Sequence, residues 1–195
     1  MLSKLFHKEY PEFWKKYSES FKNPATKYVV ISMETSGLDT EKDVIMSIAA
    51  TSVVENRILL KDSFEIFVQH NKPLDSSLDN EFITVSKVEK VAEDIAIETL
   101  INYIGNSILI GHRIDFDIEM LNYALSRLKL GKVKNEVYDI EAMFNKIADT
   151  NEKKYALEEM SKSLNMAISN RNSVADDAYS IAILFLKLKS KLGIK

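Results

Sequence analysis

The sequence predicts an α/β protein in which a mixed β-sheet is flanked by helices. Apolar, β-prone segments near residues 27–33, 44–55 and 58–69 follow one another, and a short polar turn joins the last two. This is the pattern of an antiparallel meander. Helical periodicity and short apolar runs then alternate along the rest of the chain. Strands that alternate with helices indicate a sheet that is covered by helices.

The composition is that of an ordinary globular protein and excludes several functional classes. The chain has 195 residues, 46% of them apolar and 28% charged, which suits one domain with a substantial core. A net charge of −3 gives no overall attraction to nucleic acid, so such binding would need a local patch. The absence of cysteine excludes disulfides and thiolate chemistry, and it suits the cytoplasm, where we expect the protein. The most apolar run, residues 181–186, is too short to span a bilayer, so we expect no membrane association.

Residues 1–24 are predicted to form a helical extension ahead of a domain that spans residues 25–195. Apolar and aromatic residues recur in the extension at helical spacing, and Pro11 suits the first turn of a helix. The stripe consists of Leu2, Leu5, Phe6, Tyr10, Phe13, Trp14, Tyr17 and Phe21. Two interpretations stand: the stripe packs onto the domain behind it, or it docks a protein partner.

The remainder of the chain is expected to alternate helices and strands. The expected elements are, in order, a loop over residues 71–80, a helix over 91–104, a buried strand at 107–110, a helix through 118–128, a strand at 136–138 and helices at 156–164 and 176–191. Asp139 directly follows one of these strands and is placed to cap the next helix.

The end of the first strand carries the most informative pattern. Side chains alternate along a strand, so Ser32 and Glu34 share one face. A carboxylate at each of these two positions would make a site for a divalent metal ion. Here one of the two is a hydroxyl, and the segment continues into a glycine-containing turn.

Three segments together resemble the DEDD 3′–5′ exonucleases. They are residues 34–38 (Glu-Thr-Ser-Gly-Leu), 111–117 (Gly-His-Arg-Ile-Asp-Phe-Asp) and 175–178 (Ala-Asp-Asp-Ala). The resemblance is to the DEDDh branch, which includes the proofreading epsilon subunit of bacterial DNA polymerase III and RNase T, and it covers roughly residues 27–190. It implies an RNase H-like exonuclease fold. It also implies a chemistry in which four carboxylates hold two divalent ions and a histidine takes the proton of the attacking water.

Two of the family's catalytic positions carry an unsuitable residue in this chain. The first aspartate of the family corresponds to Ser32, and the histidine five residues before the last aspartate corresponds to Asn172. A neutral hydroxyl is a poor substitute for an anionic ligand. An amide cannot accept a proton, and losing a general base typically costs roughly 10²–10⁴ in rate. The related branch that uses a tyrosine would place it at Ser173.

The resemblance assigns the remaining carboxylates to metal binding. We expect no intact catalytic set and at most one weakly bound Mg²⁺ or Mn²⁺, held by Glu34, Asp117 and Asp177. A two-metal site is not expected. The neighbouring Asp115 and Asp176 are interpreted as residues at helix starts and not as ligands.

The substrate-binding positions implied by the resemblance lie on two segments. They are Thr35, Ser36, Gly37, Leu38, His112 and Arg113. We interpret His112 as a residue that fixes its loop by hydrogen bonding. Arg113 stands where the family has asparagine, and it is either a surface residue or a guanidinium that replaces the second ion. The family's His-Gly pair has its nearest match at residues 83–85, which contain neither residue.

The resemblance leads to two functional hypotheses, and a third is independent of it. The first is a catalytically impaired module that binds single-stranded nucleic acid or acts as a scaffold. The alternative is an active but atypical metal-dependent 3′–5′ exonuclease on single-stranded DNA or RNA. The third is action in a complex through surfaces away from the cleft. A basic cluster offers phosphate contacts for the first hypothesis: Arg127, Lys129, Lys132 and Lys134.

Overall fold

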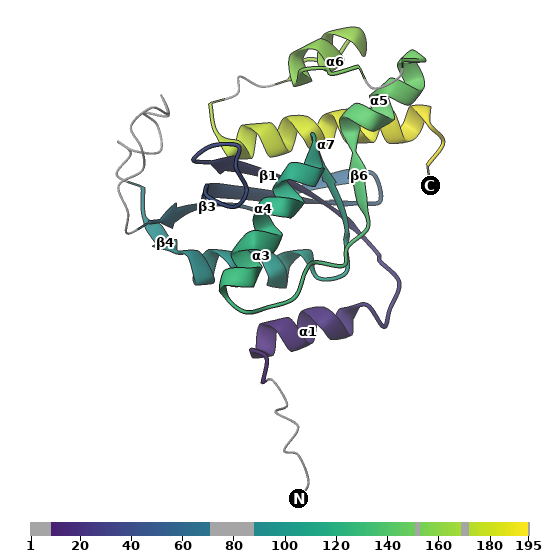
Figure 1. Cartoon of the computed structure of the whole chain (residues 1–195). Coiled ribbons are helices and arrows are strands. Elements are labelled where there is room, and N and C mark those ends of the chain that lie inside the picture. Colours follow the sequence, from purple (N-terminus) through teal and green to yellow (C-terminus); the bar gives the residue numbers. More distant parts are fainter. Residues whose placement is uncertain (1–8, 71–87, 151–152, 169–171, 195) are drawn as a thin grey trace, which may run out of the picture.

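A six-stranded mixed sheet forms the centre of the described part of the chain. The computed structural model describes residues 9–70, 88–150, 153–168 and 172–194 (Figure 1). The sheet has the order β4-β3-β2-β1-β5-β6. Its strands are β1 (Tyr28–Thr35), β2 (Ile45–Val54), β3 (Arg57–Gln69), β4 (Lys90–Ala92), β5 (Ile108–Gly111) and β6 (Val137–Asp139). β1, β2 and β3 pair antiparallel, whereas β4, β5 and β6 run parallel to their neighbours.

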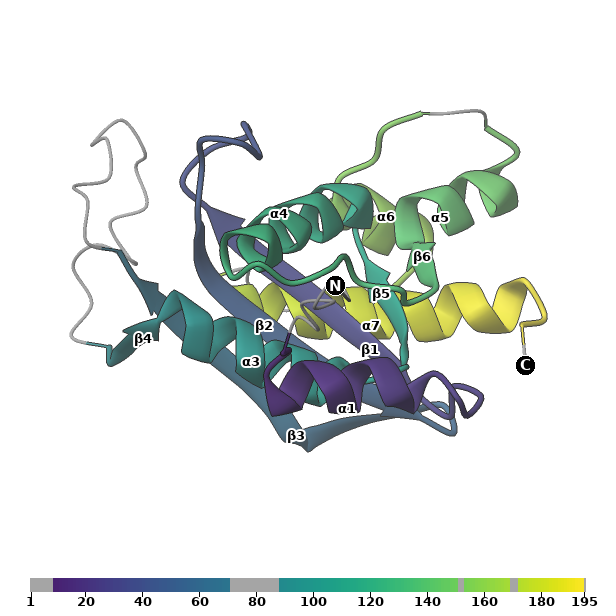
Figure 2. The ribbon, with the colours of Figure 1, turned by 60° about the horizontal axis from the view of Figure 1, so that its bottom comes forward.

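Helices cover both faces of this sheet. They are α1 (Glu12–Ser20), α3 (Glu93–Ile104), α4 (Ile114–Arg127), α5 (Ile140–Ala148), α6 (Leu157–Ser163) and α7 (Val174–Lys191). Figure 2 shows α1, α3 and α4 on one side of the sheet and α7 on the other. Val29 and Ile31 of β1 pack into the first layer, and Val30 packs into the second, with α5, α6 and α7. No helix in the described residues is long and apolar enough to cross a membrane.

The antiparallel meander is confirmed. Glu55 and Asn56 form the tight turn between β2 and β3. Their φ angles of 48° and 63° are both positive, as in the type I′ turns that match the twist of a β-hairpin. The strand β4 was not expected. Val91, assigned to a helix by its spacing, instead pairs with Val68 in a short parallel ladder, and the helix begins at Glu93. The expected loop over residues 71–80 lies outside the described residues.

The aromatic stripe near the N-terminus packs into the chain's own core. Trp14 and Tyr17 are buried in the cluster that contains Val29 and Ile31. The Tyr17 hydroxyl accepts a hydrogen bond from the backbone N–H of Lys134 and donates one to Oδ1 of Asn135, both at 2.7 Å. The packing interpretation is therefore confirmed, and these buried rings do not support docking of a protein partner. The stripe residues Leu2, Leu5 and Phe6 lie outside the described residues.

Candidate functional site

The turn after β1 is held by a compact set of hydrogen bonds. The Ser36 hydroxyl donates to Oδ1 of Asp43 at 2.8 Å and accepts from the backbone N–H of Val44 at 3.1 Å. Gly37 lies directly against the Asp43 carboxylate, with which any added Cβ would collide. A side chain at position 37 would therefore force the Asp43 carboxylate to move, which would disturb its hydrogen bond with Ser36.

This turn presents an apolar side chain to solvent. Leu38 is 85% exposed, although leucine prefers burial. The Thr35 hydroxyl donates to the carbonyl of Gly37 at 2.7 Å and thereby orders the backbone that leads to Leu38. Thr35, Ser36 and Gly37 thus shape the turn, and Leu38 is the member of this predicted substrate-binding segment that is most available to a ligand.

Ser32 and Glu34 share a face of β1, as predicted. Both are half-buried, and they lie on the same side of the strand as Val30, the side that α7 covers. Across the antiparallel ladder, Ser32 lies opposite Ala49 and Glu34 opposite Ser47. The Ser47 hydroxyl is buried and has no hydrogen-bond partner among the described residues.

Asp117 lies beside the end of β1. It comes from the first turn of α4, is only 8% exposed, and accepts a hydrogen bond from the backbone N–H of Met33. Burial raises the pKa of Asp117 well above its ordinary value, the negative charge of Asp139 raises it further, and the Met33 N–H opposes both effects. The structure therefore brings Asp117 next to the residue between Ser32 and Glu34, in an environment that favours the protonated acid.

Asp177 lies in the first turn of α7, where neighbouring side chains cap the helix. The Ser173 hydroxyl accepts from the N–H of Asp176 at 3.1 Å, and the Asp176 carboxylate accepts from the N–H of Asn172 at 3.1 Å. The expectation that Asp176 belongs to a helix start is confirmed. Ser173, at the position of the catalytic tyrosine in the related branch, acts here as an N-cap. Asp115 is exposed and lies in the first turn of α4, so it too belongs to a helix start, as expected.

The donor set suits a hard divalent cation only in part. Carboxylate oxygens are the ligands that Mg²⁺ and Mn²⁺ prefer. However, the described residues contain no group of three or more acidic or histidine side chains that could hold a metal ion. Ser32 supplies a neutral oxygen, and burial favours the protonated form of Asp117. The number of ions that the site holds, and the binding of one ion by Glu34, Asp117 and Asp177, stay predictions.

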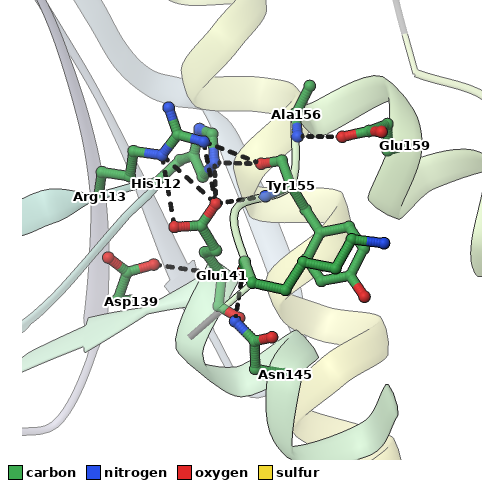
Figure 3. Close-up of polar contacts among 9 residues, drawn as sticks. His112, Arg113, Asp139, Glu141, Asn145, Tyr155, Ala156 and Glu159 are labelled. Atoms are coloured by element: carbon green, nitrogen blue, oxygen red, sulfur yellow. Dashed lines mark hydrogen bonds and ion pairs between the residues drawn. The ribbon is translucent and has the colours of Figure 1, made fainter. Parts of the chain in front are cut away.

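Arg113 binds Glu141 in the first turn of α5. Its guanidinium donates to Glu141, with Nη2 to Oε1 at 3.0 Å and Nε to Oε2 at 3.3 Å (Figure 3). The interpretation that this guanidinium takes the place of a metal ion is therefore wrong. Arg113 is a surface residue, with its side chain 50% exposed. Its φ of 56° lies in the left-handed region, which asparagine adopts more readily than arginine.

Glu141 connects three segments that meet beside Arg113. Its Oε1 also accepts from the backbone N–H of Tyr155 at 2.6 Å. His112 donates a hydrogen bond through Nε2 to the Tyr155 carbonyl at 2.9 Å, so the expected role of His112 in fixing its loop is confirmed (Figure 3). Burial alone would raise the pKa of Glu141, but the hydrogen bonds from Arg113 and Tyr155 bring it below its ordinary value. Asp139 accepts from the N–H of Glu141 at 2.7 Å and caps α5, as predicted.

The basic cluster lies at the far end of α4 from Asp117. A helix of 14 residues is about 21 Å long, so the two ends of α4 are well separated. Arg127 is paired with Glu93 through two hydrogen bonds of 3.2 and 2.5 Å. Lys129, Lys132 and Lys134 are exposed. The structure does not bring this cluster to the carboxylates at the end of β1.

Two residues that shape the site escaped the sequence analysis. Asp43 fixes the turn around Gly37, and Glu141 holds the loop of His112 and Arg113. No motif marks either of them. The only signal for Glu141 was its place two residues after the expected cap Asp139, where acidic residues favour a helix start. The family's His-Gly match at residues 83–85 lies outside the described residues.

Comparisons with known proteins relate this chain to exonucleases. Residues 29–185 match the RNase T family, which is described as exonuclease, and the chain belongs to that family. The PolC-type DNA polymerase III of Bacillus subtilis is 28% identical over 164 residues, which is 83% of this chain and 11% of that protein. The corresponding polymerase of Latilactobacillus sakei is 25% identical over 173 residues, 86% of this chain and 12% of that protein. The chain thus spans about a tenth of the length of these relatives.

Solved structures confirm the RNase H-like exonuclease fold. Exonuclease X in complex with 5′ overhanging duplex DNA superposes with a TM-score of 0.61 at 16% identity, covering 86% of this chain and 94% of that one. Escherichia coli exonuclease I, in its zinc-bound complex with single-stranded DNA, superposes with a TM-score of 0.68 at 14% identity, covering 88% of this chain and 42% of that one. At these identities the likeness concerns the fold.

Proposed function

We propose that the chain is an exonuclease-fold module that binds single-stranded nucleic acid and whose hydrolytic activity is impaired. The observation that carries this proposal is Ser32. It lies on the α7-facing side of β1, beside the strand residue that binds Asp117, where the family places a carboxylate. Removing one full negative charge from this point weakens the hold on any divalent ion, because a hydroxyl is a weaker ligand than an anion.

The proton chemistry of the site supports the same conclusion. Hydrolysis of a phosphodiester needs a group that accepts the proton of the attacking water. Asn172, at the position of the family's histidine, has an amide side chain with no basic nitrogen. Asp117 is buried and bound to the Met33 N–H, so it is not free to act as a mobile base. A divalent ion held by Glu34, Asp117 and Asp177 would supply charge neutralisation for a bound phosphate, and it would do so with fewer anionic ligands than the family uses.

Nucleic-acid binding is supported by the turn after β1. Leu38 projects from a backbone that the Asp43 and Thr35 contacts make rigid, so an apolar contact to a base requires little further ordering. Exonuclease I of Escherichia coli has been solved with a dT13 oligonucleotide, and its fold is shared by this chain with a TM-score of 0.66. Single-stranded DNA is therefore the ligand that we assign to this site.

A labelled oligonucleotide tests binding and cleavage in one design. A single-stranded DNA with a 5′ fluorophore is titrated with the full chain, and anisotropy reports binding while a sequencing gel reports shortening, with Mg²⁺ or Mn²⁺ present. The control is a Glu34→Ala/Asp117→Ala double variant. We expect saturable, salt-sensitive binding and no shortening above the control. Stepwise 3′ shortening that the double variant lacks would establish the active, atypical exonuclease instead. A folded chain that binds no oligonucleotide would favour action through other surfaces.

A further inference from the structure

A carboxylate on β3 lies in the same row of side chains as Ser32. Ser32 pairs with Ala49 across the β1–β2 ladder, and Ala49 pairs with Glu65 across the β2–β3 ladder. Directly paired residues of antiparallel strands project from the same face. Ala49 lies in the core layer that contains α7, so all three side chains project toward that helix. Ala49 carries only a methyl group, so the neighbouring position in this row is small.

The Glu65 carboxylate reaches the first turn of α7. Its Oε1 accepts a hydrogen bond of 3.2 Å from the backbone N–H of Ala175, the second residue of the helix. The first N–H groups of a helix have no partner within it, and the helix dipole favours negative charge at this end. Ser173 already binds the N–H of Asp176. Among the described residues, the hydrogen bond from the Ala175 N–H to Glu65 ties this first turn to the sheet.

Asp177 lies on this same helical turn, two residues after Ala175. Its backbone N–H donates to the Ser173 carbonyl at 3.2 Å, so its position follows the position of the turn. We propose that Glu65 is a positioning residue that holds the start of α7, and with it Asp177, over the row formed by Ser32, Ala49 and Glu65. The inference rests on the proposed function in one respect: it takes Asp177 as a carboxylate that contacts a bound ion.

The test uses two substitutions of one residue in the full chain. Glu65→Ala removes the acceptor, whereas Glu65→Gln keeps an amide oxygen that can accept from Ala175. Glu98→Ala is the matched control, because Glu98 is exposed on α3, on the opposite face of the sheet. Backbone hydrogen exchange at residues 175–177 measures the order of the turn. Electron paramagnetic resonance of free Mn²⁺ measures the affinity for the ion.

We expect Glu65→Ala to speed exchange at Ala175 by about tenfold or more, since a hydrogen bond to a charged acceptor is lost. We expect it also to weaken Mn²⁺ binding several-fold, and Glu65→Gln to stay within about twofold of the unaltered chain in both measurements. The control should change neither. Global destabilisation would speed hydrogen exchange throughout the sheet. Faster exchange that is confined to residues 175–177 therefore indicates a loss of positioning and not a loss of folding.

The outcomes distinguish this inference from the proposed function. If the unaltered chain binds Mn²⁺ and Glu65→Ala binds it equally well, Glu65 has no positioning role. If Glu65→Gln loses as much affinity as Glu65→Ala while exchange at Ala175 stays normal, Glu65 acts through its charge and the inference is wrong. If the unaltered chain binds no Mn²⁺, single-ion binding itself fails, and the same variants are measured in a Ser32→Asp chain. There, an unchanged affinity after Glu65→Ala, or no Mn²⁺ binding at all, overturns the inference.

Discussion

The guanidinium of Arg113 and the carboxylate of Glu141 form a two-contact ion pair, with 3.0 Å between Nη2 and Oε1. The pair joins the loop after β5 to the first turn of α5. Glu141 is the more enclosed partner, with its side chain 14% exposed against 50% for Arg113. Because of this difference in exposure, we expect removal of Glu141 to destabilise the fold more than removal of Arg113 does.

Glu141→Ala should destabilise the chain by about 2–3 kcal/mol, because it leaves the Tyr155 N–H and the Arg113 guanidinium without their acceptor. Arg113→Ala should cost no more than about 1 kcal/mol, since an ion pair with a half-exposed partner is screened by solvent. Urea unfolding followed by circular dichroism measures both. Equal losses for the two variants would contradict this account.

The pH dependence of stability should carry the opposite sign at Asp117 and at Glu141. Burial raises the pKa of folded Asp117 above the unfolded value of about 3.9, so the folded state binds more protons and stability falls as the pH rises through that window. The pKa of folded Glu141 is lowered, so its contribution is present above its unfolded pKa and is lost as the pH falls through the folded pKa.

Asp117→Asn therefore isolates the first of these effects. The amide oxygen can still accept from the Met33 N–H, while the cost of the buried charge is removed. We expect this variant to exceed the unaltered chain in stability at pH 8, with the difference shrinking as the pH falls toward 4. Thermal unfolding from pH 4 to 8 measures it. A constant difference across this range would show that Asp117 does not titrate abnormally.

Leu38→Ala should weaken binding of single-stranded DNA by about fivefold to thirtyfold, somewhat less than the value of fully burying one leucine side chain, because alanine keeps the Cβ atom, and it should leave stability unchanged. The matched control is Leu60→Ala. Leu60 is 60% exposed on β3, away from the turn. Fluorescence anisotropy with a labelled oligonucleotide compares the two. Similar losses for both variants would mean that Leu38 makes no specific contact.

Restoring the two altered catalytic positions should restore cleavage. A Ser32→Asp/Asn172→His double variant should shorten a 5′-labelled oligonucleotide from its 3′ end with Mn²⁺ at least about 10² times faster than the unaltered chain, because it regains an anionic ligand and a general base. Ser32→Asp and Asn172→His, each made alone, should cleave the oligonucleotide much more slowly than the double variant. Failure of the double variant, in a folded chain that binds DNA, would show that further positions are altered.

Tyr17→Phe should destabilise the chain by about 1–2 kcal/mol. The substitution leaves the Lys134 N–H and the Asn135 side chain without the hydroxyl that joins them to α1. Phe13→Leu, which alters the same helix without a polar contact, is the control for packing. Chemical denaturation measures both. A Tyr17→Phe variant as stable as the unaltered chain would mean that water replaces the hydroxyl without cost.

The sequence by itself determined the antiparallel meander and the later alternation of helices and strands, because period-two and helical spacings are local properties. The residue types at positions 32 and 172, a hydroxyl and an amide, are also read from the sequence alone. The sequence pattern wrongly predicted a helix at Val91. In the structure Val91 pairs with Val68 in the ladder between β3 and β4.

Only the tertiary structure decided which side chains meet. Arg113 and Glu141 are separated by 28 positions, and Glu65 and Ala175 by 110. Nothing in the local pattern of either segment indicates its partner. Whether Arg113 replaces an ion or binds α5 depends on the direction in which the loop after β5 projects, and that direction is set by the packing of α4 and α5 around the sheet. Contacts of this kind are non-local, and so they follow from the assembled fold.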